Sequence, residues 1–107
     1  MFIKIKRNTF LEAIERLEAK KPLGRGKKAY LSGNISICMA DKTVIFQAET
    51  AKVTADAEGS WNGTVLLPFQ IAISLLKIPP KEEMMTIEYL DGKLKLGPLK
   101  LKAEHFV

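Results

Sequence analysis

The chain has 107 residues and a formal net charge of +5, with 47% hydrophobic and 27% charged residues. This length fits a single domain, residues 1–107, and the composition excludes the disordered and membrane-embedded classes. The apolar and basic residues at the N-terminus alternate, unlike the continuous apolar stretch of a signal peptide, and no segment is apolar enough to span a bilayer. We therefore expect a cytoplasmic protein that does not enter membranes.

The first half of the chain predicts a strand, a helix and then further strands. Phe2–Lys6 alternates with period two, and Asn8 or Thr9 could cap the following helix. That helix is predicted from Phe10 to about Lys20, because apolar residues recur on one face. A proline and two glycines mark 22–28 as a loop. Strands are predicted at 30–40, 43–48 and 52–60, with turns at 41–42 and 62–63.

The second half repeats the order of a helix followed by strands, which hints at an internal repeat without a clean period. After a strand at 64–67, Pro68 suits the first turn of a helix that runs to Lys77, and Pro79 and Pro80 end it. Strands are predicted at 84–90, 93–96 and 99–102. Four lysines alternate with leucines in the last two strands: Lys93, Lys95, Lys100 and Lys102. They either keep a sheet edge from pairing with another strand or, as we favour, form the solvent-exposed face of an internal hairpin.

Residues that could support catalysis are scattered. Cys38 lies in an apolar run and is interpreted as a buried core residue. His105 has no His or Cys nearby, which argues against a metal site. The basic segment from Gly24 to Lys28 lacks the spacing of a Walker motif, and Trp61 is expected to pack beneath a turn rather than stack on a base. We therefore expect a protein that is not an enzyme and has no cofactor.

The positive charge is concentrated in one segment. From residue 16 to residue 28 there are six basic residues against the single acid Glu18, so this segment carries a net charge equal to that of the whole chain. Such a cluster predicts contacts with phosphates that are independent of base sequence. The alternatives are a solvated helix face, which Glu12 and Glu15 favour, and a plain surface loop. The six basic residues are Arg16, Lys20, Lys21, Arg25, Lys27 and Lys28.

Several segments resemble the first domain of the bacterial DNA sliding clamp. The first helix, Pro22–Arg25 and Tyr30–Ile35 are similar to that domain's first helix, its Pro-Leu-Gly loop and its Leu-Gly-Asn strand. Thr64–Phe69, Leu75–Pro79 and Asp91–Leu94 resemble its second helix, its helix-ending proline and its late hairpin. The resemblance covers the whole chain and rests on the order and spacing of the motifs.

The resemblance implies an α+β fold, a single DNA-clamp-like domain with two helices packed on one face of curved antiparallel β-sheets. In the family, six such domains form a ring, the helices line the hole, and DNA passes through it. The matching loop then nominates Arg25 for DNA binding. Helix positions nominate Arg16, Lys20, Lys21 and Lys77, and proximity nominates Lys27 and Lys28.

The function implied is that of a non-catalytic, sequence-independent DNA-associated protein that contacts the phosphate backbone of double-stranded DNA. Familiar clamp subunits carry two or three domains in each chain. A single domain would therefore assemble into an oligomeric ring of its own copies or serve as an accessory of another clamp or replication protein. The alternative is a monomeric protein-interaction module that keeps the fold without encircling DNA.

Overall fold

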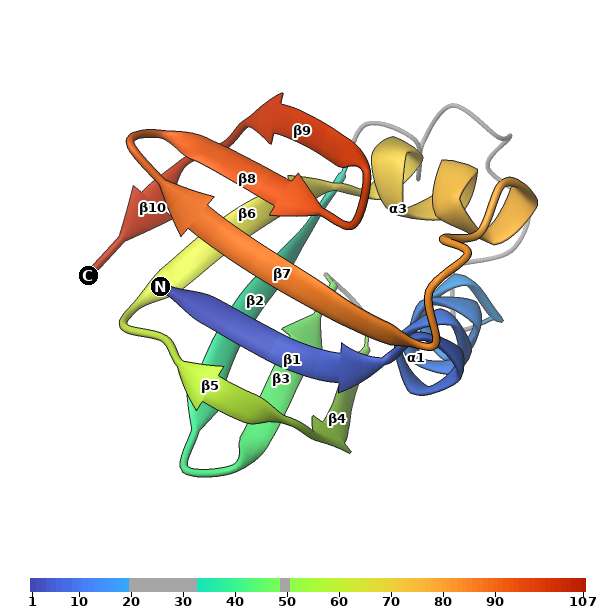
Figure 1. Ribbon diagram of the computed structural model, residues 1–107, viewed down its shortest axis with the longest axis horizontal. Helices are drawn as coiled ribbons and strands as arrows, with labels where there is room; N and C mark the ends of the chain where they lie inside the picture. The colour runs from blue at the N-terminus through green and yellow to red at the C-terminus, as the bar shows by residue number, and fades with distance from the viewer. Residues whose placement is uncertain (20–32, 49–50) are drawn as a thin grey trace.

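The structure is a computed structural model that describes residues 1–19, 33–48 and 51–107 (Figure 1). In chain order the elements are β1 (Phe2–Lys6), α1 (Arg7–Ala19), β2 (Asn34–Ala40), β3 (Thr43–Gln47), β4 (Lys52–Asp56), β5 (Glu58–Ser60), β6 (Thr64–Pro68), α3 (Phe69–Lys77), β7 (Met84–Leu90), β8 (Lys93–Leu96), β9 (Leu99–Lys102) and β10 (His105–Phe106). None of the helices in these ranges is both long and apolar enough to cross a membrane.

The strands form two antiparallel sheets of five strands each. Sheet A has the order β5-β1-β7-β8-β9, and sheet B has the order β10-β6-β2-β3-β4. Sheet A crosses in front of sheet B in Figure 1, and the two helices lie next to each other at one side of the pair. The predicted α+β fold, with two helices packed against antiparallel sheets, is confirmed.

The two halves of the chain share one topology. In the residues that the structure describes, each half runs strand, helix and four strands, from β1 to β5 in the first and from β6 to β10 in the second. The opening strand of each half joins the sheet of the other, because β1 pairs with β7 and β6 pairs with β2. The hint of a repeat in the sequence therefore reflects a repeat of topology, in which the halves exchange their first strands and share one core.

The core lies between the inner faces of the sheets and the buried faces of the helices. Phe10 of α1 and Phe46 of β3 are fully buried and pack edge to face, with ring centroids 5.6 Å apart. Ile3 and Ile5 of β1 and Ile87 of β7 lie in the same cluster. No polar or charged side chain among the described residues is buried, so every described group with acid–base chemistry lies at the surface.

The single strand predicted at 52–60 is wrong, because the structure divides it into β4 and β5 on different sheets. Buried Ala57 stands between them, and its N–H donates to the Lys42 carbonyl at 2.9 Å, which keeps the end of β4 on sheet B. The chain then crosses to β1. At Gly59, where φ is +150°, a Cβ atom would lie 2.1 Å from the Phe2 carbonyl oxygen, so this close approach requires glycine.

The predicted start of the first helix is also wrong. The helix begins at Arg7, directly after β1, so Asn8 and Thr9 are helical residues rather than caps. The Arg7 N–H donates to the Glu83 carbonyl at 2.8 Å, and its guanidinium donates to the carbonyls of Pro80 and Lys81 at 3.3 and 3.1 Å. Tertiary contacts from the segment after α3 therefore hold the helix start, and the local sequence does not reveal them.

Two single-residue interpretations have opposite outcomes. Cys38 is only half-buried: it follows the buried Ile37 on β2 and stands on the opposite, outer face of sheet B. The prediction of a core cysteine is wrong, because the apolar run Ile35–Met39 hides the alternation of the strand. Packing of Trp61 is confirmed, since its ring lies against the core and its Nε1–H donates to the Ile37 carbonyl at 3.2 Å.

Replacing Phe46 with alanine should lower the free energy of unfolding by about 3–5 kcal/mol, because it empties the contact that ties α1 to sheet B. Urea denaturation followed by circular dichroism measures this change. The matched control is Phe106→Ala on the edge strand β10, where the side chain is 53% exposed. We expect the control to lose about 0.5 kcal/mol or less; equal losses at the two positions would contradict the assigned core.

Candidate nucleic-acid interface

The structure describes two of the seven residues that the sequence nominates for DNA binding. Arg16 lies in the last turn of α1 and Lys77 in the last turn of α3, and both side chains are exposed. The two helices that carry these cations are neighbours. The other five lie outside the described residues, and their role stays a prediction: Lys20, Lys21, Arg25, Lys27 and Lys28.

Arg16 is engaged in an ion pair on the helix surface. Its Nη2 donates to Glu12 Oε1 at 2.7 Å, one turn back along α1, and both side chains are 61% exposed. An exposed i,i+4 pair of this kind contributes roughly 0.3–0.5 kcal/mol, so a phosphate could displace the carboxylate at little cost. Arg16 could therefore bind an anion, but only by exchanging Glu12 for it.

The described helical surface has no excess of positive charge. The three cations on α1 and α3 are balanced by three carboxylates on α1, and Arg7 among these cations is bound to backbone carbonyls. In the sequence, an excess of positive charge instead follows α1, because residues 20–32 include five basic residues and no acid. The balanced residues are Arg7, Arg16, Lys77, Glu12, Glu15 and Glu18.

A second concentration of positive charge lies on sheet A. Six lysines from three strands, β1, β8 and β9, stand on its outer face, and all six are exposed. Two carboxylates, Glu58 and Glu88, share this face, which leaves it a net charge of +4. We call these lysines the lysine face: Lys4, Lys6, Lys93, Lys95, Lys100 and Lys102.

Sheet B provides an internal comparison. Its five strands carry only Lys52 and Asp56 as charged residues, so their net charge is zero. The two sheets have the same topology, and the difference in charge therefore does not follow from the fold. The alternation of lysine and leucine in β8 and β9 was visible in the sequence. The sequence does not show that Lys4 and Lys6 belong to the same surface, because β1 joins sheet A only by pairing with β7.

The four lysines of β8 and β9 combine the two arrangements considered for them. Their side chains stand on the solvent-exposed face of the sheet, as the alternation of lysine and leucine predicts. However, β9 is the edge strand of sheet A and only β8 is internal, so Lys100 and Lys102 also stand at an open edge. Either description alone is incomplete.

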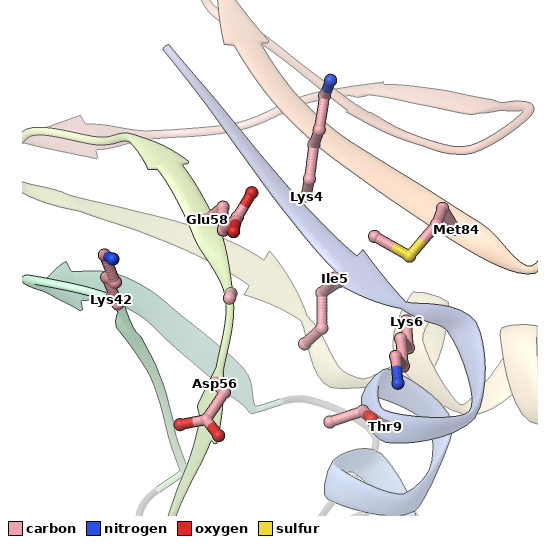
Figure 2. Close-up of a pocket in the computed structure, with 9 residues that line it drawn as sticks. Lys4, Ile5, Lys6, Thr9, Lys42, Asp56, Glu58 and Met84 are labelled. Atoms are coloured by element: carbon pink, nitrogen blue, oxygen red, sulfur yellow. The ribbon is translucent and has the colours of Figure 1, made fainter.

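A surface hollow of about 560 Å³ lies where β1 of sheet A passes β4 and β5 (Figure 2). Lys4 and Lys6 from β1 line it together with Lys42, Asp56 and Glu58. Figure 2 shows Lys4 extending away from Asp56, and no ion pair joins these groups. Mixed charges held apart in an open hollow suit solvent rather than a defined small ligand, and no group of three or more metal-ligating side chains gathers in the described part of the chain.

A second hollow, of about 740 Å³, lies beside the loop after α3. Its apolar lining includes Ile78, which is 79% exposed, together with Pro79, Met84 and Pro98, and Lys95 stands at its border. The hollow therefore adjoins the lysine face. No buried polar side chain points into it, so it offers apolar contact without fixing the orientation of a ligand.

Comparison with solved structures identifies the fold. No family model and no curated protein matches the sequence. Among solved structures, the β subunit of DNA polymerase from Streptococcus pyogenes aligns over 97% of this chain and 30% of its own, with a TM-score of 0.72 and 14% sequence identity. A sliding clamp, DNA polymerase III subunit β from Bartonella birtlesii bound to griselimycin, aligns over 98% of this chain and 29% of its own, with a TM-score of 0.69 and 14% identity.

These alignments cover almost all of this chain but less than a third of each solved chain. At 14% identity they establish the arrangement of helices and strands and not the activity. The resemblance that the sequence motifs indicated is thereby confirmed at the level of structure: the chain has the fold of a DNA sliding-clamp domain.

Proposed function

We propose that the chain is a non-catalytic, DNA-associated protein that holds duplex DNA through its phosphates without reading base sequence. The observation that carries the proposal is the fold, which matches sliding-clamp structures over 97% of this chain. The distribution of charge supports it, since the sequence between α1 and β2 carries five basic residues, whereas the described helices are themselves neutral. Lysine and arginine displace condensed counterions from DNA, which gives affinity without base contacts.

Replacing Arg25, Lys27 and Lys28 with glutamine should weaken binding to a short fluorescent duplex at low salt. Each lost phosphate contact reduces the slope of log affinity against log salt by about 0.9, so the slope should fall by between about two and three. Fluorescence anisotropy over a series of salt concentrations measures both quantities, and a thermal melt confirms that the variant is folded.

The matched control for this variant is the triple substitution K42Q/K52Q/K81Q, which removes the same charge from exposed lysines outside the nominated residues and the lysine face. The control should keep nearly the affinity and salt slope of the wild-type chain. If the control and the R25Q/K27Q/K28Q variant weaken binding equally, net charge alone explains the effect. The segment between α1 and β2 would then lose its assigned role.

We further propose that several copies act together, because one chain corresponds to less than a third of the solved chains that it resembles. Among the described residues, β4 forms one edge of sheet B and β9 one edge of sheet A, and neither pairs with a further strand there. The Ala57 N–H donates to Lys42 and the Ala48 N–H to the Ala51 carbonyl, so the alternation of the ladder directs the backbone groups of Thr54 toward the open edge. Edge pairing between copies would use these groups.

Light scattering on a sizing column, at several concentrations and with DNA present, should give a mass above that of the monomer. The substitution T54P should return the mass toward the monomer, because proline removes an outward donor while leaving the β3–β4 hydrogen bonds in place. Thr54→Ala serves as the control that keeps the donor. A wild-type chain that stays monomeric and fails to bind DNA would instead favour a monomeric protein-interaction module.

A further inference from the structure

The lysine face contains an arrangement that the fold does not need. In the register of β8 and β9, Lys93 lies opposite Lys102 and Lys95 lies opposite Lys100. Like charges directly opposite each other on one sheet face destabilise the pairing of the strands. The strands β3 and β4 hold the equivalent place in sheet B and pair without facing like charges, with Thr43 opposite Asp56 and Gln47 opposite Lys52. The paired lysines therefore point to a partner outside the sheet.

The spacing of these lysines is set by the strands. Residues opposite each other have Cβ atoms about 4.5–5.5 Å apart, and residues two positions apart along a strand are separated by about 6.6–6.8 Å. The four Cβ atoms thus outline a small rectangle on a flat surface. Across the sheet, Glu88 is the register neighbour of Lys95, but no described carboxylate forms an ion pair with any of the four lysines.

The character of the surface selects the class of partner. An exposed lysine paired with a protein carboxylate contributes about 0–1 kcal/mol at most, so four such pairs are a weak basis for docking a protein. A nucleic acid differs because its phosphates are dense and the binding of each lysine releases condensed counterions. Lysines act as point charges without the planar fork of arginine. The major groove admits a two-stranded ribbon, whereas β8 and β9 belong to a sheet of five described strands, which is too wide to enter a groove and read bases.

We propose that the lysine face, centred on the β8–β9 hairpin, is a second DNA-contacting surface, occupied by the phosphate backbone of duplex DNA. This inference rests on the proposed function, which supplies DNA as the ligand. The lysine face contains none of the residues nominated there for DNA binding. The lysines stand on the outer side of sheet A, whereas the described candidates Arg16 and Lys77 lie on the helices, so the two sets of residues belong to different elements. One chain would then hold DNA at two places.

The test compares three glutamine triples with the wild-type chain in the same anisotropy titration of a short fluorescent duplex. The triples are K93Q/K100Q/K102Q on the lysine face, R25Q/K27Q/K28Q in the sequence between α1 and β2, and the control K42Q/K52Q/K81Q. We expect the lysine-face triple to lose affinity and to reduce the salt slope by between about two and three, while the control keeps nearly the wild-type values. The thermal midpoint of the lysine-face triple should equal or exceed that of the wild type, because this triple removes facing like charges.

The outcomes separate this inference from the proposed function. A lysine-face triple that binds DNA like the control overturns the inference, and loss in R25Q/K27Q/K28Q alone would leave the proposed function standing. Loss in the lysine-face triple alone supports the inference and removes the helical site. If the lysine-face triple keeps its affinity for the duplex but loses binding to poly-glutamate, the surface serves an acidic protein and the proposal for DNA is overturned.

Discussion

The structure depends on the exchange of first strands between the two halves of the chain. β1 belongs by sequence to the first half and pairs with β7 of the second, while β6 pairs with β2. Neither sheet can therefore form from one half alone, and the buried hydrophobic residues that the structure describes in the two halves form one cluster with the partly buried ones around it. Such pairing is non-local, so the core becomes stable only when the whole domain closes. The contact between Phe10 and Phe46 then adds α1 to this closed core.

This constraint also decides where charge can go. Because the inner faces of both sheets and the buried faces of both helices are apolar, every described charge lies on the outside. The helical side and sheet B are balanced, and sheet A has an excess of four positive charges. The excess of positive charge is thus confined to the lysine face and to the sequence between α1 and β2. This distribution of charge supports the proposal that the protein holds a polyanion by its backbone.

The sequence predicts most strands and both helices, because alternation and helical spacing are local signals. It fails where a distant contact decides the structure. Glu83 and the carbonyls of Pro80 and Lys81 set the start of α1, and the crossing of the chain at Ala57 divides one apparent strand between two sheets. The candidate site behaves likewise. The basic residues near the first helix are visible as a run in the sequence, whereas Lys4 joins Lys95 and Lys100 on one face only through strand pairing.

The measurement that tests the central claim most directly is a competition between duplexes of unrelated base sequence for the wild-type chain, repeated as the salt concentration is raised. If the chain holds DNA through phosphates alone, all duplexes of one length should compete equally, and all affinities should fall along the same steep line as salt rises. A preference for one sequence that persists at high salt would contradict the account, because it would require contacts with bases.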